Sequence, residues 1–462
     1  MDIKLSEKHN LNYCAEIVVI DNLSKHSNAD RLQTTNIKGN NIITDLKTKL
    51  GDYVVYFPIE CSISDIILHN LSLYRDTTKN KDTNKTGLFD NNGRVKAVKL
   101  RGEKSEGFIL NYDDFLSVFN KTDTDKIPTL NLLFDMVDGQ IICKKYVNQT
   151  LQMSNTPKSE KFNKKAKLYN IIENQFRFHK DTEKLQNYIY KLKPNEIVQI
   201  TKKYHGTSGI SSKVLADFPK SKLELFIINI VLLLCKWFKL NININKQRYK
   251  DIYASRTVIK NDNPLGYYKC NIWQEAHKVL QPYLTEGMTM YYEIIGYLPT
   301  GSFIQKNYNY GFIKPLTNES FKFGTHFGIK IYRMTYTNTE GNCCELTSQQ
   351  IRNFCIKNNL ISMLPEELYY GKLGDIYKKK DIPHNSKFGV NFFNKIKKDD
   401  TFGMETIDTE NTIQTPFEGI VFRFESPNYL DKIVSYKLKC FRFLEFETKQ
   451  LDSGESDIEE EN

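Results

Sequence analysis

Five charged residues of this chain lie in short runs that are otherwise apolar. Lys203 precedes a small polar turn in KYHG, and Glu293 lies inside YYEIIGY. Glu418 stands near the start of FEGIVFRF, and Lys437 and Lys439 share one face of the strand-like SYKLKCF. A charge within an apolar strand usually has a partner or a chemical role. Together these residues supply a candidate nucleophile, two carboxylates and two further cations.

This combination suits the transfer of a phosphoryl group. A lysine amine attacks a nucleotide α-phosphate only when it is unprotonated, and neighbouring cations disfavour its charged form. Carboxylates such as Glu293 and Glu418 can hold a hydrated Mg²⁺ or the ribose hydroxyls. Lys437 and Lys439 can neutralise charge on the phosphate as it becomes pentacoordinate. We therefore predict a nucleotide site in which Lys203 is the nucleophile, although KxxG by itself is more often a surface lysine before a turn.

The composition is that of a globular protein with two or three domains. Its 462 residues exceed the size at which one hydrophobic core stops growing, and its net charge of +10 weakly favours a polyanionic partner. Nine scattered cysteines without a CxxC pair indicate the cytoplasm or another reducing compartment, and argue against a structural zinc site. The apolar run 225–238 is too short to cross a bilayer, so it predicts a buried helix and no membrane partner.

The spacing of apolar residues divides the chain into four parts. Residues 1–115 read as short strands between turns, which predicts a small closed β-barrel. Residues 116–165 read as a connector with some helix, residues 166–448 as the domain that carries the charged motifs, and residues 449–462 as a disordered acidic tail. Predicted strands and helices follow as residue ranges: strands 13–20, 32–37, 41–44, 53–57 and 95–100; helices 182–192, 220–240, 271–284 and 347–359.

The four charged segments also resemble a known family. KYHG, YEIIG, EGIV and KLK are similar, in order and spacing, to motifs I, III, IV and V of the covalent nucleotidyltransferases, which include DNA ligases, RNA ligases and capping enzymes. His205 after the lysine, followed by Gly206, Thr207 and Ser208, looks more like RNA ligases than DNA ligases, where Asp is usual at the histidine position. The resemblance implies that Gly206 contacts the nucleotide and Ser208 the nucleic acid.

Two further segments fit the same family. Ala254-Ser255-Arg256 resembles motif Ia, whose arginine contacts the nucleic-acid strand, and we also expect Arg256 near the nucleotide. FGIKIYRMTY resembles motif IIIa, whose aromatic side chain stacks on adenine. Tyr332 is our choice for that role, and Phe327 is the alternative. The resemblance also assigns Glu293, Lys437 and Lys439 to nucleotide binding, and Glu293 and Glu418 to the metal.

The amino-terminal segments HSNADRL, GDYVVYFP and VKAVKLRGEKSEGFIL look like the OB domain of a group of nick-sealing RNA ligases. The implied fold is α+β, with an OB-type β-barrel followed by a nucleotidyltransferase domain of antiparallel sheets flanked by helices. The implied activity is ATP-dependent joining of a 3′-hydroxyl RNA end to a 5′-phosphate end, with Mg²⁺ or Mn²⁺. The expected substrate is a nicked duplex, and the expected state is a monomer.

Two departures and two alternatives bear on this interpretation. Lys202 stands where RNA ligases often have Glu, which removes an expected adenine contact and places a cation beside Lys203. No further domain is expected after KLK, which disfavours a capping guanylyltransferase or a DNA ligase. A non-catalytic RNA-binding protein is the alternative of another class, and it is disfavoured because all five charged residues are present.

A basic strand in the first domain is a candidate nucleic-acid surface. Lys96, Lys99 and Arg101 lie close together in VKAVKLRG. They could follow an RNA backbone, since phosphate contacts dominate such binding. The plainer interpretation is the solvated face of a barrel strand.

Overall fold

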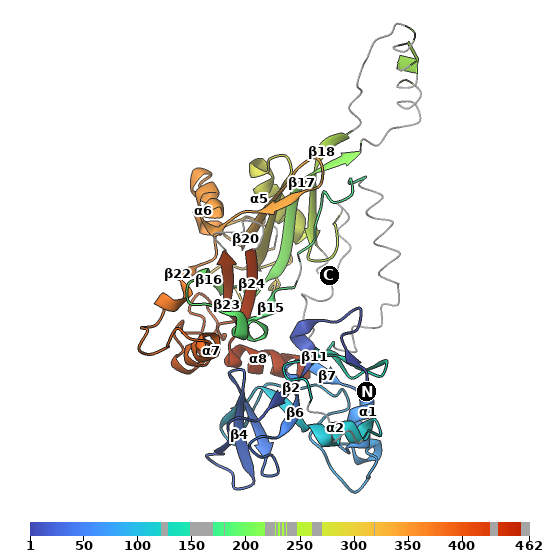
Figure 1. Ribbon diagram of the computed structural model, residues 1–462. Coiled ribbons are helices and arrows are strands. Elements are labelled where there is room, and N and C mark those ends of the chain that lie inside the picture. The colour runs from blue at the N-terminus through green and yellow to red at the C-terminus, as the bar shows by residue number, and fades with distance from the viewer. Residues whose placement is uncertain are drawn as a thin grey trace.

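The computed structural model describes residues 1–121, 128–147, 170–179, 181–217, 247–260, 270–317, 319–425 and 433–453, together with a few helical residues between 227 and 237. Figure 1 shows an amino-terminal part, blue to cyan, below a larger carboxy-terminal part, with helix α8 (Phe441–Asp452) lying between them.

The amino-terminal part is made of short strands with apolar residues on their buried face. The strand YVVYFP, for example, has five of its six residues buried. The strands pair into five sheets, in the orders β10-β6-β2-β11, β3-β4-β5, β1-β12-β13, β14-β7 and β8-β9. Their bounds are β1 Ile3–Lys4, β2 Ala15–Val19, β3 Ser24–Lys25, β4 Leu32–Ile37, β5 Asn40–Asp45, β6 Tyr53–Pro58, β7 Cys61–Ile63, β8 Val98–Leu100, β9 Glu103–Ser105, β10 Gly107–Asn111, β11 Leu133–Phe134, β12 Met136–Val137, β13 Gln140–Ile141 and β14 Cys143–Lys145.

All five predicted strands of this part are present, but among the residues that the structure describes they do not form the small closed β-barrel that we expected. Within the described residues the strands do not pair into one closed barrel. All the described strands of this part are two to six residues long, so each forms only a short ladder. In addition, β11, β12 and β14 pair with β2, β1 and β7. The segment expected as a connector therefore contributes strands to these sheets, and the helices α1 (Asp65–Asn70) and α2 (Tyr112–Val118) pack beside them.

The carboxy-terminal part contains two five-stranded sheets, in the orders β15-β24-β23-β16-β22 and β18-β17-β19-β20-β21. All pairs are antiparallel except β15 with β24. This agrees with the predicted α+β class of antiparallel sheets flanked by helices. The strand bounds are β15 Glu183–Lys184, β16 Ile197–Lys203, β17 Thr207–Asp217, β18 Gln247–Ser255, β19 Met288–Gly296, β20 Phe327–Thr337, β21 Cys343–Glu345, β22 Glu367–Lys372, β23 Gly419–Glu425 and β24 Ile433–Lys439.

Two of the predicted helices form as expected. Helix α5 (Ile272–Leu280) begins after Asn271, whose side chain accepts a hydrogen bond from the backbone of Gln274, and it buries Trp273 against the second sheet. Helix α6 (Ser348–Lys357) begins with a capping box between Thr347 and Gln350. The caps were readable from the sequence because they are local.

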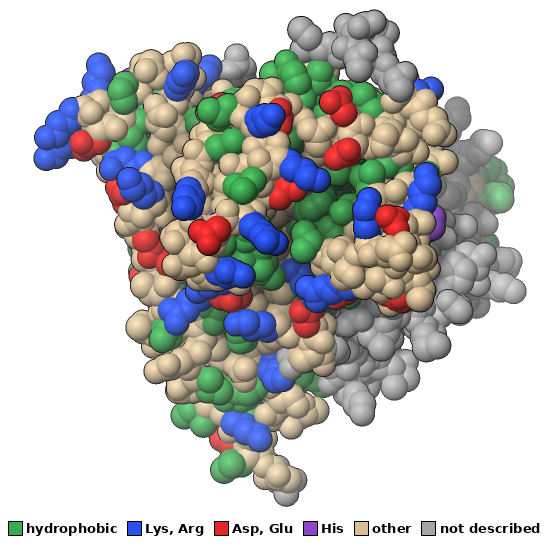
Figure 2. Space-filling model, turned by 90° about the horizontal axis from the view of Figure 1, so that it is seen from below, with side chains coloured by type: hydrophobic (Ala, Val, Ile, Leu, Met, Phe, Trp, Pro, Cys, Tyr) green, Lys and Arg blue, Asp and Glu red, His purple; other side chains and the backbone are tan. Residues whose placement is uncertain are grey.

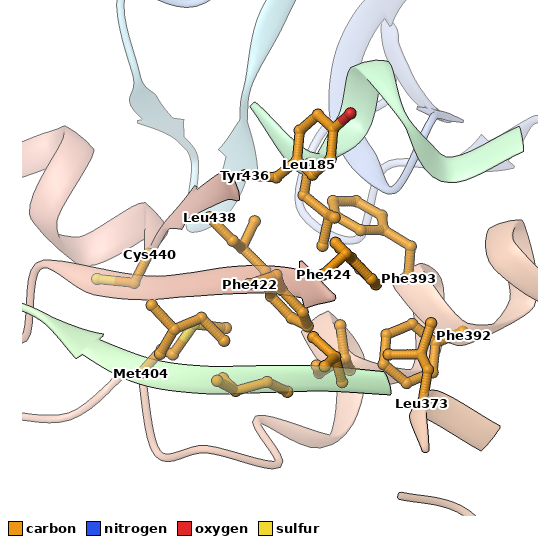
Figure 3. Close-up of a cluster of buried hydrophobic side chains, with 14 of the residues drawn as sticks. Leu185, Leu373, Phe392, Phe393, Met404, Phe422, Phe424, Tyr436, Leu438 and Cys440 are labelled. Atoms are coloured by element: carbon orange, nitrogen blue, oxygen red, sulfur yellow. The ribbon is translucent and has the colours of Figure 1, made fainter. Parts of the chain in front are cut away.

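Helix α7 (Phe388–Asp399) covers the first sheet and completes its core. Figure 3 shows Phe392 and Phe393 of this helix with Phe422 and Phe424 of β23, all in one apolar cluster. This core anchors β16, β23 and β24, the three strands that carry or border the charged motifs.

One helix prediction was wrong, and for another helix the expected burial was wrong at the positions that can be compared. Residues 182–192 form β15 and two 3-10 turns, η4 (Leu185–Asn187) and η5 (Ile189–Lys191), because Glu183 and Lys184 pair with the edge strand β24. The run 225–238 lies mostly outside the described residues, and its described positions are helical but exposed rather than buried: Ile227, Ile230, Val231, Leu233, Leu234 and Trp237.

Helix α8 was missed by the sequence reading. It includes Lys449 to Asp452, which were assigned to the disordered tail; residues 454–462 of that tail lie outside the described residues. Within the part of the chain that is described, no helix has the length and apolar character needed to cross a membrane.

Candidate active site

Lys203 is the last residue of β16, and its side chain meets Glu418. Lys203 pairs with Gly419 at the start of β23, which brings the preceding carboxylate beside it. The Lys203 Nζ lies 2.6 Å from Oε1 of Glu418. Residues 215 positions apart in sequence thus form a close ion pair, and the predicted nucleophile and the predicted metal ligand belong to one site.

The second oxygen of Glu418 is buried without a hydrogen-bond donor among the described residues. The Glu418 side chain is only 2% exposed, and its Oε2 accepts no hydrogen bond. A buried carboxylate oxygen with no donor is costly unless a cation satisfies it. The site therefore suits a cation in addition to Lys203, although the described residues hold no cluster of three or more His, Cys, Asp or Glu side chains of the kind that binds a metal alone.

Gly206 and Glu293 fix the turn after Lys203. The backbone N–H of Gly206 donates to Oε1 of Glu293 at 3.0 Å. A methyl group at position 206 would lie 2.2 Å from the carbonyl oxygen of Ile294, so only glycine allows β17 and β19 to approach this closely. Glu293 therefore has a structural contact as well as its predicted place beside the nucleotide.

A cavity of about 160 Å³ opens between the two sheets above Lys203. Six of the nine site residues predicted for this domain line it, namely Lys203, Ser208, Arg256, Glu293, Tyr332 and Lys437; Gly206, Glu418 and Lys439 are not among the lining residues. The hydroxyl of Tyr332 lies 3.3 Å from that of Ser208. Phe327, the alternative to Tyr332, is instead buried in the core and stacks on Phe321. The geometry thus favours Tyr332 as the aromatic side chain available to a bound base.

Several lining residues were not identified from the sequence. His179 packs its ring edge-on against Tyr332 at 5.2 Å, and Asp181 forms an ion pair with Arg256. Lys330 also lines the cavity, and burial lowers its pKa. The signal for Lys330 was its place in the alternating run FGIKIYRMTY, whereas no local pattern marked His179 or Asp181.

Lys437 and Lys439, on one face of β24, are placed differently. Lys437 lines the cavity between the sheets and also a second cavity of about 60 Å³ below it. Lys439 lines only the lower cavity, where its Nζ lies 3.0 and 3.1 Å from the two carboxylate oxygens of Glu447. Only Lys437 of the two therefore reaches the space beside Lys203.

Lys202 is held away from Lys203 by a buried ion pair. Its side chain is 3% exposed, and its Nζ lies 2.7 Å from Asp408 and 3.1 Å from Glu410. The ring of Tyr204 lies 5.0 Å from the same Nζ. Two carboxylates thus balance the charge of Lys202, so this charge is not left uncompensated beside Lys203.

Two of the three basic strand residues have acidic partners. The Nζ of Lys96 lies 2.7 Å from Asp90 and 2.9 Å from Asp452 of α8, and Lys99 lies 3.8 Å from Glu445 of the same helix. Of the three, only Arg101 has no ion pair among those found in the described residues. Figure 2 shows basic and acidic side chains interspersed over the face seen from below, without one continuous basic band.

No protein-family model and no curated protein matches this chain. Several solved structures, in contrast, match this chain. A Naegleria gruberi RNA ligase mutant with ATP and manganese superposes with a TM-score of 0.54 at 15% identity, covering 94% of this chain and 98% of the other. A second mutant, with AMP and manganese, gives 0.54 at 14% over the same shares. The ligase with pyrophosphate gives 0.51 at 14%, covering 95% and 99%. The chain therefore has the fold of this RNA ligase along nearly its whole length.

Proposed function

We propose that this protein is an ATP-dependent RNA ligase that joins a 3′-hydroxyl RNA end to a 5′-phosphate end. The observation that carries the proposal is the contact of Glu418 with Lys203, which itself lines a cavity together with Tyr332, Arg256 and Lys437. The shared fold with an RNA ligase supports it. The expected substrate is a nicked duplex in a reducing compartment such as the cytoplasm, and the expected state is a monomer.

In the first step the Nζ of Lys203 attacks the α-phosphorus of ATP. The N–P bond forms, the bond to the bridging oxygen breaks, and pyrophosphate leaves. The amine must lose a proton before it attacks, and Glu418, at 2.6 Å, is placed to accept it. Lys437 lies where it can offset the charge that develops on the phosphate oxygens. The product is lysyl-AMP.

The remaining steps use the same cavity. The 5′-phosphate of the RNA attacks the adenylyl phosphorus, which transfers AMP to the RNA and frees Lys203. The 3′-hydroxyl then attacks the 5′-phosphorus, a phosphodiester forms, and AMP leaves. Arg256 and Ser208 line the cavity on the side of the second sheet and are the residues we assign to the nucleic-acid strand.

Glu418 and Glu293 are the residues that would hold Mg²⁺ or Mn²⁺. The donor-less Oε2 of Glu418 fits a hard cation, which prefers carboxylate oxygen. A cation bound there would supply positive charge to the phosphates and would weaken the hold of Glu418 on the Lys203 ammonium.

Labelling with radioactive nucleotide tests the proposal. Protein, Mg²⁺ and either labelled ATP or labelled GTP are incubated and run on a denaturing gel, with Lys203→Ala as the matched variant. We expect label from ATP in the wild type and none in the variant. Label from GTP would instead support a capping enzyme, and no label would support a non-catalytic RNA-binding protein.

A substrate panel then separates the ligase types. Nicked duplexes with RNA or DNA on each side of the nick, and free single strands, are offered to the labelled enzyme. Sealing that requires an RNA 3′-hydroxyl end supports the proposal, whereas equal sealing of an all-DNA nick would favour a DNA ligase.

A further inference from the structure

The turn between β6 and β7 places a carboxylate of the amino-terminal part beside the motif strand β24. The Oε1 of Glu60 lies 3.9 Å from the Nζ of Lys439, across the lower cavity that residues of both parts line. Glu60 is 12% exposed and Lys439 18%. The contact therefore joins a turn near the start of the chain to the last residue of the strand that carries Lys437.

Lys439 does not need Glu60 in order to be neutralised. Glu447 of α8 already contacts its ammonium through both carboxylate oxygens. Burial alone would lower the pKa of Lys439, but Glu447, Glu60 and Glu418 together raise it well above its ordinary value. Lys184, on β15, is a second cation near Glu60. A simple ion pair between the two parts would use one carboxylate, whereas the Lys439 ammonium has both Glu447 and Glu60 near it.

The backbone of Glu60 is in a conformation that a side chain opposes. Its φ is 69°, in the left-handed region that glycine adopts without cost. Hydrogen bonds from its N–H to Val95 and from Tyr146 to its carbonyl, 2.9 and 2.8 Å long, hold it there. Non-glycine residues in this region persist where the surroundings fix them, and they gather at functional sites. Glycine would suit the backbone at this position better, so we explain the presence of glutamate there by its carboxylate.

The neighbouring residue Ile59 helps to set the distance between Glu60 and Lys439. It packs in one small buried cluster with Ala97, on the amino-terminal side, and Phe441 of α8. Phe441 follows Lys439 by two residues, so the position of Lys439 is set by the same contacts that seat α8 on the amino-terminal sheets. Figure 1 shows α8 wedged between the two parts.

From this arrangement we propose that Glu60 is a positioning residue for nucleotide transfer. This inference rests on the proposed function of the protein as an RNA ligase. Glu60 and Glu447 together fix Lys439, and through β24 they fix Lys437, which lines the nucleotide cavity two residues away on the same face. The amino-terminal part thus takes part in the reaction of Lys203 with ATP, and not only in binding nucleic acid.

The test compares three variants in single-turnover labelling by ATP. Glu60→Gln removes the charge and keeps the shape, and Glu60→Gly removes the charge and also relieves the backbone. Asp452→Asn is the matched control, because it removes a carboxylate from the same interface, where it pairs with Lys96 and Arg94 rather than Lys439. For each variant the maximal rate, the ATP concentration at half saturation and the melting temperature are measured.

We expect both Glu60 variants to lower the maximal rate by about tenfold or more, with half saturation little changed, because a misplaced cation acts on the transition state. Asp452→Asn should label at nearly the wild-type rate. The melting temperature of Glu60→Gly should be no lower than that of Glu60→Gln, and yet Glu60→Gly should still be labelled slowly. If the role of Glu60 were only structural, the labelling rate of each variant would instead follow its melting temperature.

A wild-type rate in Glu60→Gly overturns the inference, and so does an equal loss in Asp452→Asn, which would mean that any loosening of the interface slows the reaction. Absence of an adduct in the wild-type protein has a different meaning. It overturns the proposed function, and the inference with it.

Discussion

At the scale of single residues, the adjacent lysines Lys202 and Lys203 have different surroundings. Lys202 and Asp408 are 3% and 2% exposed and form a buried ion pair. Removing one partner leaves a buried charge, so we expect Lys202→Met to lower the free energy of unfolding by about 3–5 kcal/mol. Denaturant unfolding measures this. Because Lys203 is untouched, ATP labelling should persist in the variant under conditions where it remains folded.

A second substitution isolates the cause. If the loss in Lys202→Met comes from an unpaired carboxylate, adding Asp408→Asn should restore part of the stability. No recovery would mean that packing against Tyr204, rather than charge, holds Lys202 in place. Loss of labelling in a folded Lys202→Met would mean that the reaction with ATP also requires Lys202.

A buried histidine gives a prediction about pH. His277 packs on Tyr253, its Nδ1 lies 3.0 Å from the hydroxyl of Ser211, and burial lowers its pKa from 6.5. The unfolded chain binds a proton that the folded chain resists, so stability is fully present above pH 6.5 and falls as the pH drops toward the depressed folded value. Unfolding measured from pH 7.5 to 5 should show a shallower slope for His277→Gln; an unchanged slope would assign the dependence to other groups.

At the scale of elements, the site depends on how closely β17 and β19 approach. A Cβ at position 206 would meet the Ile294 carbonyl at 2.2 Å, so Gly206→Ala must push the strands apart and displace Glu293. We expect a loss of about 1–3 kcal/mol of stability, from overpacking, and labelling about a hundredfold slower, since small displacements cost that much. Urea unfolding and single-turnover labelling measure the two effects.

Gly51→Ala is the control for this prediction. Gly51 has φ 89° but nothing within 4 Å of its missing Cβ, so the substitution costs only the backbone strain, about 1 kcal/mol. The rate of labelling should not change. Equal rates in Gly206→Ala and the wild type would show that the turn after Lys203 tolerates displacement.

At the scale of the whole molecule, α8 changes what the amino-terminal part is expected to do. From the sequence alone, deleting residues 1–115 should spare the reaction with ATP more than sealing, because every nucleotide motif follows residue 200. The interface of α8 with Lys96, Lys99 and Ile59 makes that separation incomplete. We now expect the truncated protein to lose labelling by ATP as well as sealing of a pre-adenylylated nick, assayed in one soluble preparation.

The basic strand can be divided by the same interface. Lys96 pairs with Asp452, so Lys96→Ala should lower the melting temperature, while Arg101→Ala should leave it unchanged. If Arg101 contacts phosphate, its variant should reduce the slope of log binding constant against log salt by about 0.9. Nick binding measured over a salt series decides this. An unchanged slope would leave no member of the predicted basic strand as an RNA contact.

The sequence by itself determined the local features. The helices that start near Asn271 and Thr347 and the alternating strands could be predicted, because capping and alternation depend on residues a few positions apart. Four motif residues were also placed on strands, because the apolar pattern around each was clear. In the structure these residues line one cavity: Lys203, Glu293, Tyr332 and Lys437.

Only the tertiary structure decided which charges meet. The pairing of Lys203 with Glu418 fits the predicted chemistry, but Lys202 with Asp408, Lys96 with Asp452 and Lys439 with Glu60 join segments about 200 to 380 residues apart. A side chain's charge is visible in the sequence, whereas its partner depends on strand register and on the docking of α8. The same reason explains why residues 182–192 form a strand and two turns instead of a helix: the free edge of β24 offers hydrogen bonds that no local pattern records.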